Sequence, residues 1–479
     1  GWPLSLGAGL GVGARAALIP AHVELHLPAR AAVHRQGLEL QRAGFGVGGE
    51  VEIVETERQL LIGGGGARAG TGDRQRVGIH LQLAPDHHAG DGGTLRAEDQ
   101  IGRRIAQPGA GASGGNGAQL SYSYVQPLAN AGLWHQLPEL LLSPRSPLKM
   151  RPQWDVHQWR WGLEFLRACN RRTSERSTQH LLALAALSRH GFEAMLQAEQ
   201  LDCNFSNTGK LVLYSTPAGL AAAQQQMELQ RAWGSEQEAV SPQRCVEIEP
   251  ALQHYHRSIA GAIYTPSECA ADCLAVCQGL QRLLAARGVR FVLGTRVEGF
   301  VHHARRIAAV QTSAGAIEAQ QFVLALGSAS HQAAKTMGFR LPIYPLKGYS
   351  VTLDTTDAAG AAPRVNVTDA ARKVVFARIG QRLRVAGMAE LVGHDDHIPP
   401  ARIQSLCEAT RALFPGCSDF SELRPWTGMR PATPTGVPLV GRHTHAPDNL
   451  LLNTGHGALG FTLAFGTAAQ VAELVVPTA

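Results

Sequence analysis

The stretch of sequence that decides the fold covers residues 426–465 and reads WTGMRPATPTGVPLVGRHTHAPDNLLLNTGHGALGFTLAF. It opens with a Gly/Pro-rich segment, residues 428–431, which we expect to be a loop carrying one arginine. The apolar run at residues 450–453 is short enough to be a buried parallel strand. A glycine-rich turn, residues 455–460, then leads into an apolar helix. Strand, turn and helix start together predict an anion-binding corner, because backbone N–H groups and the helix dipole favour negative charge there.

This order of motifs resembles the C-terminal segment of the FAD-dependent amine and amino acid oxidoreductases, the superfamily of glycine oxidase, sarcosine oxidase and D-amino acid dehydrogenase. The resemblance implies an α/β fold: a two-dinucleotide-binding-domain flavoprotein with a Rossmann-like FAD domain and an α+β substrate cap. It also implies that Arg430 of the G-x-R-P segment binds the substrate carboxylate. The G-H-G-x-x-G turn would lie against the flavin, with Gly455, Gly457 and Gly460 as cofactor contacts. His456 joins the catalytic candidates as a residue that shapes this turn rather than one that transfers protons.

Bulk composition indicates a two-domain globular chain. At 479 residues, with 44% hydrophobic content, it is long enough to bury two cores. The net charge of +6 comes mostly from arginines scattered among acids, which argues against a nucleic-acid-binding patch. No apolar run approaches the length of a membrane span. We therefore expect a cytoplasmic protein, with peripheral contact on the inner face of the cell membrane left open.

The cysteines do not predict a metal site. All eight cysteines fall at or after Cys169 without a paired framework, which favours a reducing compartment. Cys269, Cys273 and Cys277 recur at intervals of four, as on one helical face, but no fourth ligand lies nearby, so we expect apolar packing.

Residues 1–104 are compositionally unlike the rest of the chain, since they contain no Lys, Asn, Cys, Met or Tyr. They stand where the resemblance requires the first FAD-binding βαβ unit and its G-x-G-x-x-G fingerprint. Residues 11–16 and 64–69 both fit G-x-G-x-x-A, but Pro20 shortens the helix after the first and a loop follows the second. We interpret the segment as anomalous sequence of the kind that a shifted reading frame produces, with the authentic frame resuming near Ile105.

A second small-residue turn, residues 112–117, resembles the segment that passes the flavin in bacterial D-amino acid dehydrogenases, and a Ser-Tyr-Ser-Tyr run follows it. The resemblance implies cofactor contacts from Ser113, Asn116 and Gly117. Residues 111–115 also spell G-x-S-x-G, the nucleophile elbow of α/β-hydrolases, with Ser113 as nucleophile. That motif needs a strand before it and a helix after it, whereas Pro108 and Gly109 precede it here.

The remaining cofactor contacts follow from two further strands. A strand is predicted from residue 297, and the resemblance implies a backbone contact to adenine at Val297. A buried strand over residues 321–326 ends in A-x-G, which implies FAD pyrophosphate contacts at Ala325 and Gly327. We therefore assign residues 105–150, 251–335 and 426–479 to the FAD-binding domain, and residues 151–250 and 336–425 to the substrate cap.

The resemblance implies FAD-dependent oxidative deamination of D-amino acids to 2-oxo acids and ammonia, with electrons passed to a quinone-linked acceptor of the respiratory chain. Arginine suits the carboxylate anchor because its planar donors bind a carboxylate in pairs. Tyr349, on a predicted cap strand, is expected to cover the same carboxylate. Two alternatives stay open: an oxygen-using amine oxidase of glycine, sarcosine or proline, and a non-catalytic protein that lacks a complete FAD site.

Overall fold

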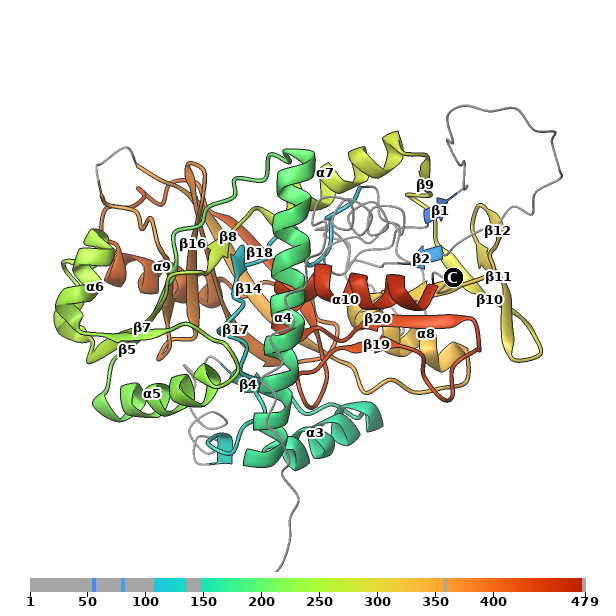
Figure 1. Cartoon of the computed structure of the whole chain (residues 1–479), viewed down its shortest axis with the longest axis horizontal. Helices are drawn as coiled ribbons and strands as arrows, with labels where there is room; N and C mark the ends of the chain where they lie inside the picture. Colours follow the sequence, from blue (N-terminus) through green and yellow to red (C-terminus); the bar gives the residue numbers. More distant parts are fainter. Residues whose placement is uncertain (1–53, 57–78, 82–106, 135–147, 357–359, 476–479) are drawn as a thin grey trace, which may run out of the picture.

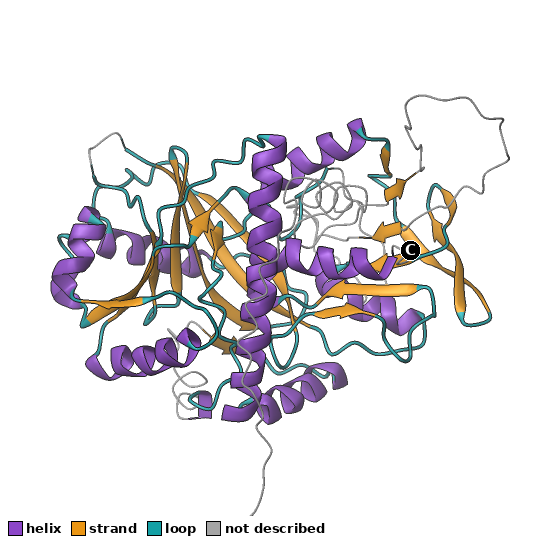
Figure 2. Cartoon of the chain, viewed as in Figure 1, coloured by secondary structure: helices purple, strands orange, loops and turns teal. Residues whose placement is uncertain are grey.

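The computed structural model describes residues 54–56, 79–81, 107–134, 148–356 and 360–475 of the chain. Figure 1 shows a cap half built on a large sheet, a second half with smaller sheets, and the long helix α4 between them. Figure 2 shows that helices flank the sheets in both halves. The expectations for residues 1–104 lie outside the described residues, except for the short strands β1 (Val54–Thr56) and β2 (Ile79–Leu81).

The cap is organised on a nine-stranded mixed sheet. Its strand order is β18-β14-β17-β16-β15-β5-β7-β6, and β4 pairs with β17 outside this path. Strand bounds are β4 (Leu148–Met150), β5 (Lys210–Tyr214), β6 (Glu238–Val240), β7 (Gly261–Thr265), β14 (Tyr344–Asp354), β15 (Asn366–Asp369), β16 (Val374–Ile379), β17 (Arg382–Leu391) and β18 (Arg424–Ala432). The cap-side helices are α3 (Val156–Ala168), α5 (Pro217–Arg231), α6 (Pro242–Ile248), η2 (Pro250–Leu252), η3 (His256–Ser258) and α9 (Pro400–Leu413).

The second half contains the parallel strands that the sequence predicts. β20 (Leu450–Thr454) and β13 (Phe322–Leu324) run parallel, with Leu450 opposite Phe322, and both are wholly buried. Continuous apolar runs are typical of such strands, because both faces of a parallel sheet are covered. The other elements outside the cap sheet are β3 (Gln119–Leu120), β8 (Cys269–Ala270), β9 (Val289–Phe291), β10 (Val297–His303), β11 (Arg306–Thr312), β12 (Gly315–Glu318), β19 (Leu439–Gly441), α7 (Cys273–Ala286), η4 (Gly327–Ala329), α8 (Ser330–Thr336), η5 (Gly457–Leu459) and α10 (Gly460–Val475). Of these, β8 lies beside β16 on the cap side (Figure 1).

Helix α4 (Arg171–Glu199) packs along α10 and so joins the two halves (Figure 1). Asn170 caps its N-terminus by accepting a hydrogen bond from the Thr173 N–H, and Gln200 ends it in the left-handed conformation. The two helices approach closely at Gly466, where an added Cβ would lie 2.5 Å from the Leu184 carbonyl oxygen. Only glycine fits at this contact.

Two expectations about local structure differ from the observed fold. Residues 428–431 lie inside strand β18 rather than in a loop, because β18 pairs with β14 along its whole length. β18 is an edge strand, where proline is tolerated because one row of N–H groups has no ladder partner. Cys269 lies in β8 and α7 begins only at Cys273, so the three cysteines do not share one helix.

The cap also extends beyond its expected boundary at residue 250. Strand β7 pairs with both β5 and β6, so residues 261–265 belong to the cap sheet. The sequence-based division placed them in the FAD-binding domain because nothing local distinguishes a cap strand from an FAD-domain strand.

One stretch within the described residues, Gly457–Val475, is long and apolar enough to cross a membrane, although the sequence analysis expected no such run. Its mean hydropathy is 1.4, and polar residues such as Thr462 interrupt it, so a count of uninterrupted apolar residues misses it. Phe461, Leu463 and Val471 are buried, and the helix packs on α4 and β20. This packing is that of the core helix of a globular protein.

Candidate functional site

Arg430 lies on a glycine floor formed by two neighbouring strands. β14 and β18 pair so that Leu346 faces Arg430 and Gly348 faces Gly428. Because side chains alternate along a strand, Arg430 projects from the same sheet face as these two glycines. Its guanidinium covers Gly348, since a Cβ added there would lie 2.4 Å from Arg430 Cζ. We call this the site face; it also carries Ser350 of β14 and Arg384 of β17.

The charge of Arg430 has no carboxylate partner among the described residues. Its Nη1 donates to the Met388 carbonyl oxygen at 2.8 Å. Met388 adopts a left-handed conformation, φ 64°, at a β-bulge of β17 opposite Gly348. Burial lowers the pKa of Arg430 to about 10, so the side chain stays charged at neutral pH. A partly buried cation with spare N–H donors and no counter-ion favours an anionic ligand.

The small-residue turn at residues 112–117 packs against the same site face. Ser350 Oγ donates to the Gly115 carbonyl oxygen at 2.9 Å, and Arg384 Nη1 donates to that of Asn116 at 2.7 Å. The Trp426 indole covers Gly115 and Gly428, where an added Cβ would lie 1.9 Å and 2.0 Å from its ring atoms. The turn expected to contact the flavin therefore lies on the same face as Arg430.

The residues of this turn that were expected to contact the cofactor have different surroundings. The Asn116 side chain accepts a hydrogen bond from the Ala118 N–H at 2.8 Å, which supports the left-handed conformation of Ala118. Asn116 thus shapes the turn through its side chain. Gly117 packs on the cap sheet, with an added Cβ 3.3 Å from Val375 Cγ2. Ser113 is buried in a series of turns, and the next element is the short strand β3 rather than a helix, so the nucleophile elbow of a hydrolase does not form.

The glycine corner at the C-terminus meets the end of β18. Ala432, two residues after Arg430, forms an isolated antiparallel bridge with His456. Gly455 and Gly457 have positive φ angles of 81° and 56°, which glycine adopts without strain. Gly460 begins α10, so strand, turn and helix start follow in the expected order.

His456 is held as a neutral imidazole within this corner. Its Nε2 lies 3.1 Å from Thr467 Oγ1 on α10, and burial lowers its pKa to about 4. A neutral ring tied to the helix supports the interpretation that His456 shapes the turn.

The A-x-G segment forms the other side of the corner. Ala325 and Gly327 follow β13, and Gly327 opens η4, which contacts β18. Thr454 Oγ1, at the end of β20, donates to the Gly327 carbonyl oxygen at 3.2 Å. Val297 lies apart from this contact, at the start of β10, where it is buried with β13 residues in one core cluster.

The structure does not bring Tyr349 to Arg430. Tyr349 lies on the opposite face of β14, fully buried, and its hydroxyl donates to Glu390 Oε2 at 2.6 Å. Arg402 of α9 forms an ion pair with the same carboxylate. Tyr349 therefore belongs to a buried hydrogen-bond network of the cap and does not cover the substrate carboxylate. Neighbouring residues of a strand point to opposite faces of the sheet, so Tyr349 and Gly348 lie on different sides.

Four residues of the site face were not expected from the sequence: Gly348, Ser350, Arg384 and Trp426. These residues come together through strand pairing, which aligns β14 with β17 and β18. Residues 114–116 then pack against these strands. No local motif marks these positions.

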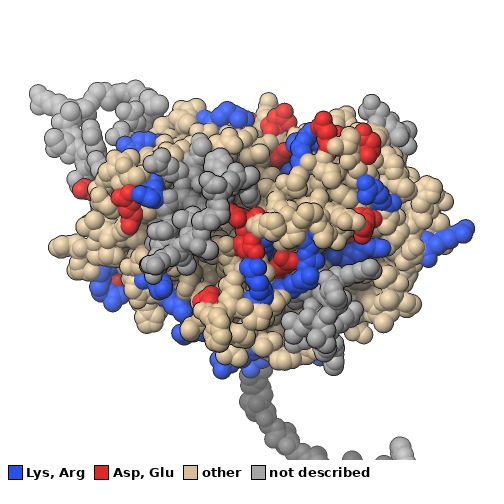
Figure 3. Space-filling view, turned by 180° about the vertical axis from the view of Figure 1, so that it is seen from behind, with Lys and Arg blue, Asp and Glu red and all other residues tan. Residues whose placement is uncertain are grey.

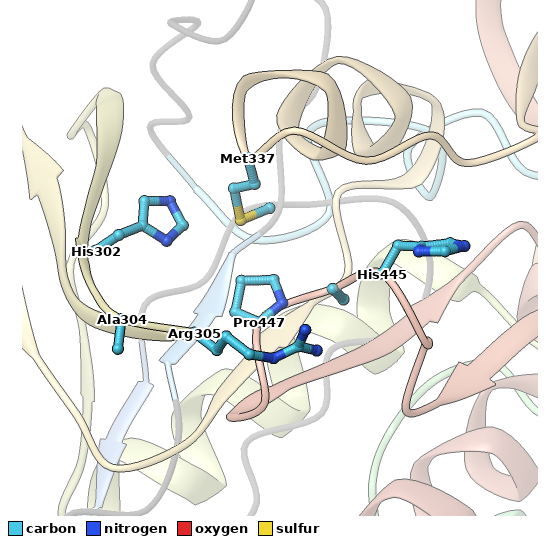
Figure 4. Close-up of a pocket in the computed structure, with 7 residues that line it drawn as sticks. His302, Ala304, Arg305, Met337, His445 and Pro447 are labelled. Carbon is cyan, nitrogen blue, oxygen red and sulfur yellow. The ribbon is translucent and has the colours of Figure 1, made fainter.

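A separate surface pocket lies between the β10–β11 hairpin and the loop before β20 (Figure 4). Its lining residues are His302, Ala304, Arg305, Met337, His445, Ala446 and Pro447. None of the expected site residues is among them, so this pocket is distinct from the Arg430 site.

Comparison with known proteins identifies a family and several relatives of this chain. A family model described as FAD dependent oxidoreductase matches residues 103–474. The chain is 47% identical over 377 residues to D-amino acid dehydrogenase 2 of Ralstonia nicotianae, covering 77% of this chain and 88% of that relative. It is 44% identical over 364 residues to D-amino acid dehydrogenase 2 of Pseudomonas aeruginosa, covering 75% and 85%.

Solved structures share the fold at low sequence identity. Glycine oxidase from Geobacillus kaustophilus matches with a TM-score of 0.60 and 18% identity, over 78% of this chain and 86% of that one. L-proline dehydrogenase from P. horikoshii matches with a TM-score of 0.56 and 19% identity, over 62% and 78%. Together with the family match, these likenesses confirm the fold class expected from the sequence.

Proposed function

Because the chain belongs to the FAD-dependent oxidoreductase family, and is thus an FAD-dependent enzyme, we propose that it oxidatively deaminates D-amino acids to 2-oxo acids and ammonia. The family resemblance and the FAD cofactor inferred from the sequence are confirmed by the same matches. The observation that supports the substrate class is Arg430, a cation without a carboxylate partner in the described chain, which lies over Gly348 beside the turn expected to contact the flavin.

The described residues fit a bound FAD. The turn at residues 112–117 has its Gly114, Gly115 and Asn116 carbonyl oxygens bound by cap side chains, which leaves N–H groups for a cofactor. The glycine corner at residues 455–460 adds a helix start in which Gly455, Gly457 and Gly460 have no side chain to obstruct a ligand. When bound, FAD supplies the hydride acceptor for the α-hydrogen of the substrate.

The chain's own residues have a simple task in this reaction. Arg430 binds the substrate carboxylate through its paired N–H donors and thereby fixes the direction of the α-hydrogen. The amine reacts in its neutral form, and the imine product hydrolyses in water to the 2-oxo acid and ammonia. No general base is required, and the described charged side chains that lie on the glycine floor or bind the turn are the arginines Arg430 and Arg384.

For the electron acceptor we propose a quinone-linked carrier, reached by peripheral contact with the inner face of the cell membrane. The outer face of α3 supports this contact, because Val156, Trp159 and Leu163 are exposed there beside Arg160, and Trp154 just before the helix is fully exposed. Exposed tryptophan with arginine is typical of surfaces that meet a lipid interface.

On the face drawn in Figure 3, basic and acidic side chains are interspersed, without the broad basic patch that nucleic acid would need.

The absorbance spectrum of the purified chain tests the function directly. Under nitrogen, D-alanine is expected to bleach the flavin bands, whereas L-alanine leaves them unchanged. A flavin spectrum that D-amino acids do not change would contradict the proposed substrate class. Reoxidation by oxygen with release of peroxide, faster than by a quinone analogue, would replace the proposed acceptor with that of an amine oxidase.

A further inference from the structure

The cap holds the flavin-contact turn through three consecutive carbonyl groups. Arg384 Nη1 donates to the carbonyl oxygens of Gly114 at 3.3 Å and Asn116 at 2.7 Å. Ser350 Oγ donates to the intervening carbonyl oxygen of Gly115 at 2.9 Å. All three carbonyl groups therefore face β14 and β17, across the junction between the cap and the FAD half.

Arg384 is not explained by an ion pair. It is 6% exposed, and burial lowers its pKa. The nearby carboxylate of Asp272 is paired with Arg382 at 3.1 Å, and the Arg384 Nε is buried without a partner among the described residues. Burying a guanidinium against carbonyl oxygens alone is costly, so a purely structural role is a poor account of it.

The bound carbonyl groups determine where the N–H groups of the turn point. In a planar trans peptide, the C=O of one residue and the N–H of the next point in opposite directions. Binding the Gly114 and Asn116 carbonyl groups to the cap therefore directs the N–H groups of Gly115 and Gly117 away from it. Among the described residues neither N–H has a hydrogen-bond partner, whereas the Asn116 N–H bonds to the Ser113 carbonyl oxygen at 3.3 Å.

We propose that Arg384, assisted by Ser350, is a positioning residue that fixes the direction of the peptide groups in this turn, so that the Gly115 and Gly117 N–H groups face the FAD. Two donors on one side, with a buried cation behind them, stabilise negative charge on the reduced cofactor more than on the oxidised one. The role depends on FAD binding at the turn and not on which amino acid is oxidised.

The test uses the FAD-loaded full chain with Arg384→Met, which removes the charge and the donors while keeping much of the side-chain volume. We expect the visible flavin bands to shift, FAD to bind about tenfold more weakly, and the reduction potential to fall by about 30 mV, the equivalent of tenfold for a two-electron couple. The potential is measured by dithionite titration against a reference dye, without amino acid, so failure of the D-alanine reaction does not affect the result.

Arg382→Met is the matched control. Arg382 lies on the same strand, is more exposed and pairs with Asp272 without touching the turn, so its flavin spectrum and potential should match the wild type. If Arg384→Met does not fold, Arg384→Lys and Ser350→Ala decide the question, with smaller shifts expected in the same direction. Wild-type spectrum and potential in every variant that folds would overturn the proposal.

Discussion

In the proposed function, binding of the substrate carboxylate depends on Arg430. Replacing it with lysine keeps a positive charge but removes the planar pair of donors, so one strong contact to a carboxylate is lost. For Arg430→Lys we expect kcat/KM for D-alanine to fall about 100-fold, or about 3 kcal/mol, in a dye-coupled assay. Arg424→Lys is the control, because Arg424 lies on the same strand but is exposed and pairs with Asp354. Equal losses of kcat/KM in the two variants would show that Arg430 does not bind the substrate carboxylate.

Tyr349 illustrates how a single residue can belong to the cap rather than to the site. Its hydroxyl donates to Glu390, which also pairs with Arg402. Tyr349→Phe should therefore lower the free energy of unfolding by about 1–2 kcal/mol, measured in urea, because a buried carboxylate loses a donor. The KM for D-alanine should stay unchanged, since the side chain faces away from Arg430. A large rise in KM at wild-type stability would show that Tyr349 contacts the substrate.

At the scale of elements, the pairing of β14 with β18 creates the floor under Arg430. Gly348→Ala places a methyl group where the guanidinium now lies, 2.4 Å from its carbon. Because the end of an arginine side chain moves easily, the variant should fold normally yet raise the KM for D-alanine by about tenfold. Gly299→Ala on β10, where an added Cβ meets nothing within 4 Å, is the matched control. An unchanged KM for Gly348→Ala would show that substrate binding does not depend on the position of the Arg430 guanidinium.

The contact between α3 and α8 is expected to depend on pH. His157 and His331 stack with ring centroids 3.4 Å apart, and burial lowers the pKa of His331 from 6.5 to about 4. Between these pH values the unfolded chain takes up a proton that the folded chain does not, so stability is lost as pH falls from about 6.5 to about 4. His331→Asn, which retains an N–H donor for the Leu341 carbonyl oxygen, should weaken this dependence in urea unfolding at several pH values. An equal slope in both proteins would contradict the expectation.

For the whole molecule, the packing of α4 on α10 joins the cap to the FAD half. Gly466→Ala would press a methyl group against the α4 backbone, so the free energy of unfolding should fall by about 1–3 kcal/mol. Gly162→Ala, on α3 with nothing within 4 Å of an added Cβ, should be neutral or stabilising by about 0.5–1 kcal/mol. Urea unfolding of both variants tests the contrast, and a stable Gly466→Ala would mean that the helices can separate without cost.

The sequence by itself determined the features that depend on neighbours in the chain. The apolar run before the glycine turn forms the buried parallel strand β20, and the A-x-G segment follows its partner β13. These motifs, with the G-x-R-P arginine, were enough for the fold class, the family and the FAD cofactor, because hydrophobic runs and glycine turns encode local structure directly.

Only the tertiary structure decided which side chains share a face. Tyr349 and Gly348 are adjacent in sequence but lie on opposite sides of β14, and the register with β18 determines which of them meets Arg430. Arg384 and Ser350 reach the turn at residues 114–116 from more than 230 positions away in sequence. Such contacts depend on strand pairing between distant segments, and in this chain no local pattern reveals that pairing.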